Sequence, residues 1–194
     1  MHAAGLADHA ESPPFLSAVL ADPNHVWSRT AQIAVMVRLG PPLSAAGDAF
    51  AYSDSGYVLL GEVIERATGQ PLGQAVRNLL RWKDQGLTQV RWEGEPPAPG
   101  PHRAHQWMDG FDTSLIHGSV DAFGGGGIIA STEDAARLFA ALVSGAKFDQ
   151  PETLDLMLSA PGHPARHPED GLNPDDFVGD GRLIGTLSCA LPIR

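Results

Sequence analysis

The chain has 194 residues, of which 43% are hydrophobic, and this is enough to bury one core of ordinary size. Its 23 acidic residues outnumber the 13 basic ones and give a formal net charge of −10. This acidic balance, without a cluster of Lys and Arg, argues against nucleic acid and anionic membrane as partners. A small neutral or cationic ligand is easier to accommodate.

Cysteine content and hydropathy narrow the class of protein further. The single cysteine, Cys189, excludes an internal disulfide and any metal site built from several cysteines. No apolar stretch approaches the roughly eighteen residues of a membrane span, and the segment from Met1 to Gly5 lacks the regions of a signal peptide. The sequence as written predicts a soluble, cytoplasmic chain, an expectation that an export signal upstream would change.

The first clear helical pattern covers residues 31–39. Thr30 is positioned to cap it, and Gly40-Pro41-Pro42 ends it. The spacing predicts one apolar face, formed by Ile33, Met36 and Val37.

A second, better marked helix follows residues 52–54. Its predicted apolar face recurs at helical spacing, Glu62 is placed to pair with Arg66, and Thr68-Gly69 ends the element. The face consists of Tyr57, Leu60, Ile64 and Ala67. A short helix over 72–80 comes next.

The second half of the chain alternates loops with short elements. Residues 93–112 are rich in Pro, Gly, His and aromatic side chains without a sustained period, which predicts a long surface loop. The run 124–127 is all glycine and precedes a short apolar segment, 128–130, expected to be a short strand or an extended turn. The glycines lack the Lys-Ser/Thr of a phosphate loop, so they indicate close backbone packing.

Ser131-Thr132-Glu133-Asp134 matches a capping box and opens a predicted helix. The residues expected on its buried face are Ala135, Leu138, Phe139 and Leu142. A further helix is expected from Pro151 to Leu158. Convincing strands are few, so the chain is predicted to be mostly α-helical.

The composition changes after residue 161. Residues 162–182 are rich in His, Pro, Asp and Gly and offer few apolar groups, which predicts the most mobile part of the chain. We therefore expect one domain over residues 1–161 and a divergent or flexible tail over 162–194.

The triplet Tyr52-Ser53-Asp54 stands directly before the second helix, within a longer run of related residues. This run resembles the second active-site motif, Tyr-x-Asn with Asp as a variant, of the serine β-lactamase and penicillin-binding-protein family. Two further segments resemble that family, Gly125 to Asp134 and His2 to Leu6, the latter with alanines where the family has hydroxyls. The likeness covers residues 1 to about 160 and implies part of an α+β β-lactamase/transpeptidase-like fold.

The resemblance implies a serine hydrolase that cleaves an ester or amide through an acyl-enzyme. Tyr52 would relay the serine proton, Asp54 would hold a lysine or the substrate amide, and Gly125 and Gly126 would contact the substrate. A phenol needs a nearby ammonium to ionise readily, so Tyr52 depends on a lysine. No cofactor is implied, and the partner would be a small ester or amide.

Two family motifs are not found in these 194 residues. In the family, a Ser-x-x-Lys helix lies upstream of the segment that resembles His2 to Leu6, and a Lys/His-Thr/Ser-Gly strand completes the site. The literal Ser144-Gly145-Ala146-Lys147 falls at a predicted helix C-terminus, whereas the mechanism requires the serine at an N-terminus. We therefore expect this chain to be inactive alone. The alternative is a non-catalytic remnant or binding module that keeps the wall of the cleft.

Simpler interpretations compete with each motif. Asp54 or Ser55 would serve only as the helix cap if Tyr52 merely packs. Metal binding at His102 and His105, or at His163 and His167, is disfavoured because prolines surround these pairs.

Overall fold

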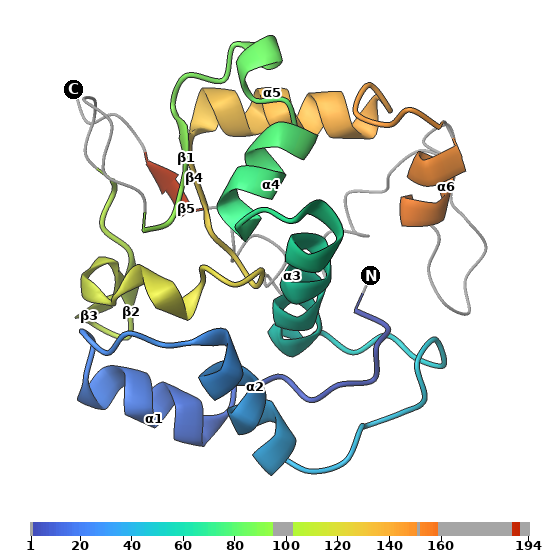
Figure 1. The fold of residues 1–194 in the computed structure, drawn as a ribbon. Helices are drawn as coiled ribbons and strands as arrows, with labels where there is room; N and C mark the ends of the chain where they lie inside the picture. The colour runs from blue at the N-terminus through green and yellow to red at the C-terminus, as the bar shows by residue number, and fades with distance from the viewer. Residues whose placement is uncertain (1, 95–102, 151, 159–187, 191–194) are drawn as a thin grey trace.

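The computed structural model describes residues 2–94, 103–150, 152–158 and 188–190 (Figure 1). The helices are α1 Pro13–Ala21, α2 Arg29–Arg38, α3 Asp54–Thr68, α4 Leu72–Leu79, α5 Thr132–Val143 and α6 Glu152–Leu158. Short 3-10 turns are η1 Lys83–Gln85, η2 Thr113–Leu115 and η3 Gly118–Val120. The described part is mostly helical, as the sequence predicts.

A three-stranded sheet lies beside α5. It has the order β1-β4-β5, with β1 Val90–Trp92, β4 Ile128–Ser131 and β5 Ser188–Ala190. β1 runs antiparallel to β4, and β5 runs parallel to it. The predicted strand at 128–130 is confirmed. The predicted mobile segment 162–182 lies outside the described residues.

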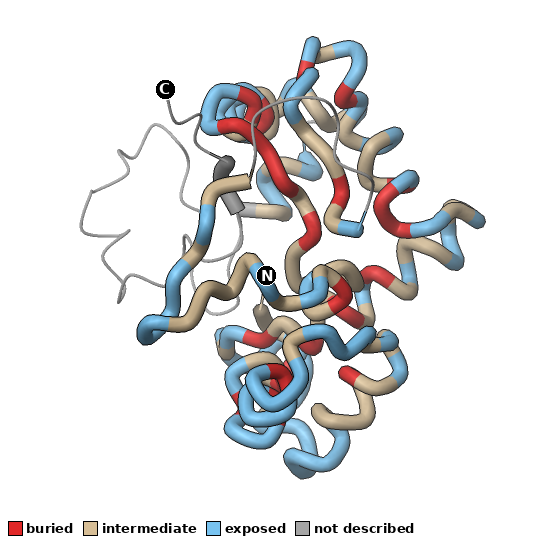
Figure 2. Tube along the Cα trace, turned by 90° about the vertical axis from the view of Figure 1, so that its left-hand side faces the viewer, coloured by how far each residue is buried: buried red, intermediate tan, exposed pale blue. Residues whose placement is uncertain are grey.

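In Figure 1, α3 lies at the centre of the molecule, between α1 and α2 on one side and α4, α5 and the sheet on the other. A buried cluster of Trp82, Leu87 and Leu138 joins the α4 end, the approach to β1 and α5. Buried positions continue along β4, where Ile129 and Ala130 are almost fully enclosed (Figure 2). Because consecutive strand residues point to opposite faces, both faces of β4 are covered. Val90 and Ile128 pack against the buried cluster, and α5 contacts β4.

Local capping explains three of the helix boundaries, the starts of α2 and α5 and the end of α3. Ser131 accepts a hydrogen bond from the backbone N–H of Asp134 at 3.2 Å, so the capping box is confirmed. Gly69, with φ 65°, ends α3 in the left-handed conformation as predicted. The cap proposed for α2 was wrong, because Ser28 caps it through the Ala31 N–H and the helix begins at Arg29.

The predicted helix faces were less accurate than the helices. In α2 the fully buried side chain is Gln32, whose Nε2 donates to the carbonyls of Ser119 and Val120. In α3 the buried residues are Ser55, Val58 and Gly61. Phe139, predicted to be buried, is 58% exposed, and Leu60, on the predicted apolar face of α3, is 47% exposed. Tertiary packing selects these faces, and it overrides the local apolar pattern.

The predicted loop over 93–112 contains a β-hairpin, so that interpretation was incomplete. β2 Trp107–Met108 pairs with β3 Phe111–Asp112 across Asp109 and Gly110. Both turn residues have positive φ, 49° and 82°, the arrangement that a two-residue hairpin turn of type I′ requires.

The N-terminal segment lies along the connection between α2 and α3. Backbone N–H groups of Leu43, Gly47 and Ala51 donate to the carbonyls of Gly5, Ala3 and His2, at 2.7, 2.8 and 2.8 Å. These bonds place His2 beside the start of α3.

Candidate functional site

One pocket of about 370 Å³ contains all four residues that the sequence singled out, Tyr52, Asp54, Gly125 and Gly126. His2 lies in the same lining. The apolar part of the wall comes from α3, α4, β1 and β4, through Leu60, Ile64, Leu72, Val76, Trp92 and Ile128. Apolar walls with a few convergent polar groups are typical of small-molecule sites.

The start of α3 aims the polar groups into this pocket. Ser53 has an extended backbone and makes no side-chain cap. Instead Oδ1 of Asp8 accepts hydrogen bonds from the N–H groups of Asp54 (3.2 Å) and Ala10 (3.0 Å). Ser55 is buried against His9, with its Oγ 3.0 Å from the His9 ring Nδ1. Capping by Asp54 or Ser55 is therefore the wrong interpretation, because Asp8 takes that role.

Tyr52 and Asp54 are joined directly. The phenolic hydroxyl of Tyr52 donates to Oδ1 of Asp54 at 3.1 Å. Burial and the Asp54 charge raise the pKa of Tyr52 above its ordinary value, so the phenol keeps its proton at neutral pH. Burial, and next the charge of Asp8, raise the pKa of Asp54 to about 6. In this chain Tyr52 is therefore a hydrogen-bond donor, and it would need a cation beside it to act as a base.

His2 is the member of this site that the sequence did not single out. Its ring stacks on Tyr52, with centroids 4.4 Å apart, and lies 4.9 Å from the ring of Tyr57. The backbone N–H of Ser53 donates to Nδ1 at 3.2 Å, which leaves the ring proton on Nε2. Burial lowers the pKa of His2. The sequence signal that could have indicated His2 is its position in the segment His2 to Leu6, which resembles a segment of the family.

The glycine run forms the opposite wall by lying directly on α3. A Cβ at Gly124 would come within 2.3 Å of the Tyr57 carbonyl oxygen, and one at Gly61 within 2.2 Å of the Phe123 carbonyl oxygen. Only a glycine pair allows this approach. Gly125 faces the Asp54 side chain, and the Gly126 N–H donates to the Asp121 carbonyl at 3.1 Å. The close-packing interpretation of residues 124–127 is confirmed.

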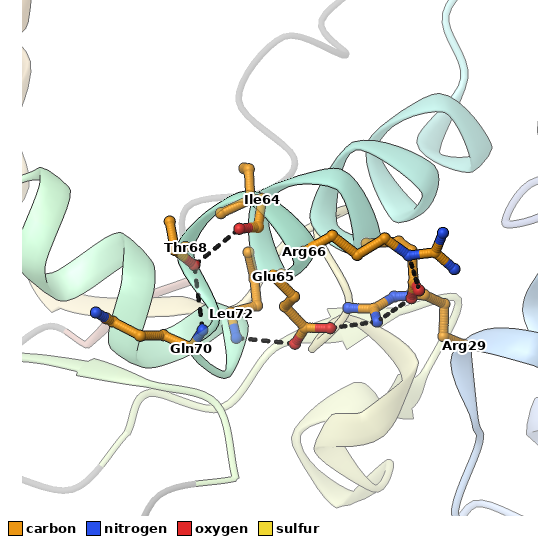
Figure 3. Close-up of polar contacts among 8 residues, drawn as sticks. Arg29, Ile64, Glu65, Arg66, Thr68, Gln70 and Leu72 are labelled. Carbon is orange, nitrogen blue, oxygen red and sulfur yellow. Dashed lines mark hydrogen bonds and ion pairs between the residues drawn. The ribbon is translucent and has the colours of Figure 1, made fainter.

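An ion-pair network joins α2 to α3 (Figure 3). Arg29 contacts Glu62 at 2.7 Å and Glu65 at 2.5 Å, and its guanidinium lies over the Phe123 ring. Glu65 also accepts a hydrogen bond from the Leu72 N–H at 2.8 Å. Arg29 thus joins α2 to α3 and to Phe123, the residue before the glycine run, and Glu65 extends the network to Leu72, the first residue of α4. The predicted Glu62–Arg66 pair is confirmed at 2.9 Å.

The literal Ser-x-x-Lys lies elsewhere. Ser144 is the C-cap of α5, and its hydroxyl donates to the Ala141 carbonyl. The Lys147 ammonium donates to the Leu80 carbonyl at 3.0 Å. Neither side chain lines the pocket. The predicted position of this Ser-x-x-Lys motif at a helix C-terminus is confirmed.

The described ranges hold no group of three or more His, Cys, Asp and Glu residues suited to a metal ion. His102, His163 and His167 lie outside them. Within the same ranges, no helix is long and apolar enough to cross a membrane.

Known folds resemble this one. A D-stereospecific amidohydrolase from Streptomyces sp. superimposes with a TM-score of 0.65 and 24% identity, over 81% of this chain and 48% of that chain. For D-amino acid amidase from Ochrobactrum anthropi SV3 the TM-score is 0.62 at 21% identity, over 79% and 44%. A penicillin binding protein from Bacillus halodurans gives 0.62 at 16%, over 80% and 49%.

These likenesses establish a β-lactamase/transpeptidase-like fold, and the chain spans about half the length of the structures that it matches. No curated protein matches the sequence. The family model described as Beta-lactamase matches residues 1–184, nearly the whole chain. With the pocket built around Tyr52 and Asp54, this match identifies the chain as a member of the beta-lactamase family.

Proposed function

We propose that this chain contributes the tyrosine wall of a serine hydrolase site that cleaves a small ester or amide. The observation that carries the proposal is the placement of Tyr52 and Asp54 at the start of α3, opposite Gly125, in one pocket. In such a site a serine oxygen attacks the carbonyl carbon, the amine or alcohol leaves, and water then releases the acyl group. Tyr52 would take the serine proton and return it to the leaving group.

The nucleophile is expected from outside these 194 residues. The pocket lining contains no serine or lysine among the described residues. A lysine ammonium beside Tyr52 would lower its pKa and so allow the phenol to serve as a base. The names of the two structural neighbours that are amide hydrolases support an amide substrate, and one of those structures holds L-phenylalanine amide.

The second candidate function is a binding module without chemistry. The hydrogen bond between Tyr52 and Asp54 favours it. In a hydrolase the tyrosine hydroxyl would bond to a serine or a lysine, whereas here it donates to Asp54. Under this proposal the pocket would bind a small molecule and release it unchanged.

Two experiments test the proposals. The purified 194-residue chain should neither hydrolyse aryl esters, amino-acid amides or a chromogenic β-lactam, nor react with a fluorophosphonate probe. Two outcomes would contradict this expectation. Turnover that is present in the chain and lost in Ser144→Ala would identify Ser144 as a nucleophile. Turnover that is present and lost in Tyr52→Phe would show that Tyr52 acts in catalysis without a serine and lysine from outside these residues.

The second experiment reads the coding sequence in frame before Met1. The hydrolase proposal expects a Ser-x-x-Lys there, and expects the longer chain to lose turnover in Tyr52→Phe. An unrelated sequence there, together with reversible ligand binding, would favour the binding module.

A further inference from the structure

The pocket is elongated along α3. Asp54, Tyr57, Leu60 and Ile64 all line it, and their spacing of three or four residues places them on one face of the helix. From Asp54 to Ile64 the helix rises by about 15 Å along its axis. The pocket therefore extends from the polar start of α3 into the apolar part of the fold.

The end of the pocket remote from Asp54 is apolar. Leu72 and Val76 reach it from α4, where they lie one turn apart on the same helix face. Trp92 and Ile128 reach it from the sheet, where they are partners in register on β1 and β4 and so share one face. These four side chains carry no titratable group, so this end offers a ligand apolar contact. A lysine supplied beside Tyr52 would leave that property unchanged.

Trp92 forms a fixed wall at the apolar end. Its side chain is buried, with 8% exposure. A Cβ at Gly73 would come within 2.6 Å of the indole, and so would a Cβ at Gly127. The indole is thus held between α4 and the glycine run, and it cannot move aside without displacing backbone. A wall that cannot move sets the depth of the pocket.

Backbone forms the wall between the two ends. Gly61 and Gly124 to Gly126 line the pocket without side chains, and contact with the carbonyl oxygens of Phe123 and Tyr57 leaves no room for one at Gly61 or Gly124. A ligand can therefore pass along this wall from the polar end to the apolar end. A volume of about 370 Å³ that extends over about 15 Å fits a narrow ligand better than a compact one.

We infer that the pocket binds a linear, uncharged alkyl chain along α3, with the polar group of the ligand beside Tyr52 and the end of the chain at Trp92. The inference rests on the proposed function, since it specifies the substrate class of that site. For the hydrolase, it means esters or amides that carry a linear alkyl chain, with the scissile carbonyl beside Tyr52. The length and the apolar walls of the pocket carry the inference, and the charge at the start of α3 has no part in it.

The test is a binding series of neutral alcohols on the 194-residue chain, measured by calorimetry or ligand-observed NMR. The linear probes are n-butanol, n-hexanol and n-octanol, and cyclooctanol is a compact probe with as many carbons as n-octanol. Each step along the linear series should strengthen binding about five- to tenfold, because each step buries two more methylenes. We expect n-octanol to bind about fivefold more tightly than cyclooctanol, whose ring cannot extend to Trp92.

Two phenylalanine substitutions assign the chain end to the pocket. Ile64→Phe places a larger side chain at the apolar end, and it should weaken n-octanol about five- to tenfold while leaving n-butanol unchanged. Val63→Phe enlarges the neighbouring side chain of α3, which is exposed and outside the lining, and should leave every affinity unchanged. A general loss of folding would weaken every probe alike, so the dependence on chain length distinguishes a filled pocket from a damaged fold.

Three results would overturn the inference. These are affinities that do not rise with chain length, n-octanol binding no more tightly than cyclooctanol, and a series that Ile64→Phe leaves unchanged. Because the series measures binding alone, its failure is distinct from failure of the hydrolase proposal. A longer chain that hydrolyses short-chain and long-chain esters at equal rates would contradict this inference and support the proposed chemistry. A longer chain that binds the alcohols in the expected order and hydrolyses neither ester would contradict the chemistry alone.

Discussion

Tyr52 donates its phenolic hydrogen to Oδ1 of Asp54 across 3.1 Å, and this bond joins a residue two positions before Asp54 to the first residue of α3. Asp8 lies beside this pair, and its carboxylate accepts a hydrogen bond from the Asp54 N–H. Two carboxylates and one phenol therefore meet at a partly buried helix start. Burial, and next the negative charge of Asp8, make ionisation of Asp54 unfavourable in the folded state.

Asp54→Asn should stabilise the protein at neutral pH. The pKa of Asp54 in the folded state, about 6, lies above its ordinary value of 3.8, so the folded state holds the proton more tightly. Well below pH 3.8 both states are protonated and no penalty exists; as pH rises from there towards 6 the unfolded state ionises first and stability falls. The variant should gain about 1–2 kcal/mol at pH 7, after allowance for partial exposure, and the gain should vanish near pH 3.

Denaturant unfolding at several pH values measures that gain. The asparagine retains an acceptor for Tyr52, so the hydrogen bond survives the exchange. A variant that is less stable than the natural chain at pH 7, or a gain that does not change between pH 3 and 7, would contradict the assignment.

Tyr52→Phe should raise the pKa of Asp54 above about 6, because the phenolic hydrogen bond favours the carboxylate. A ¹³C NMR titration of the Asp54 carboxyl carbon measures this directly. Tyr57→Phe is the matched control, because Tyr57 lines the same pocket and the hydroxyl that donates to Asp54 is that of Tyr52. An Asp54 pKa that falls in Tyr52→Phe would show that the bond does not stabilise the ionised carboxyl.

Gly61→Ala should destabilise the fold by about 1–3 kcal/mol, because its Cβ would meet the Phe123 carbonyl oxygen at 2.2 Å. Gly56→Ala, in the same helix, meets only the Ala4 Cβ at 3.8 Å. It should stabilise by about 0.5–1 kcal/mol through helix propensity. Thermal unfolding of the two variants compares them, and equal effects would exclude the close approach of the glycine run to α3.

Arg29→Met should lower the free energy of unfolding by about 1–3 kcal/mol, since it removes the shared partner of Glu62 and Glu65. The control is Arg66→Met, whose side chain is 80% exposed and should matter little. Chemical denaturation distinguishes them. Equal stability of both variants would mean that the network in Figure 3 does not hold the helices together.

The sequence predicted the elements well where local chemistry decides them. The capping box at Ser131 and the Gly69 end of α3 depend on neighbouring residues, and both are found. The hairpin turn Asp109-Gly110 is a local signal too, but the surrounding Pro, Gly and aromatic residues show no alternation that would indicate its strands.

Contacts between distant segments could not be predicted from local patterns. His2 reaches Tyr52 because residues 2–5 pair with residues 43–51, and Asp8 reaches the start of α3 by the same route. Gln32 is buried because two carbonyls of η3 satisfy its amide. Each of these depends on long-range packing, so the sequence indicated Tyr52 and Asp54 but not the residues that hold them.

The central claim is that the pocket around Tyr52 and Asp54 is the ligand site of this chain. A ¹H–¹⁵N NMR titration of the 194-residue chain with phenylalanine amide tests it most directly. We expect the largest shift changes at Asp54, Tyr57 and Gly124 to Gly126, with none at Ser144 or Lys147. Changes centred on Ser144 and Lys147, or no saturable changes at the pocket, would contradict the account.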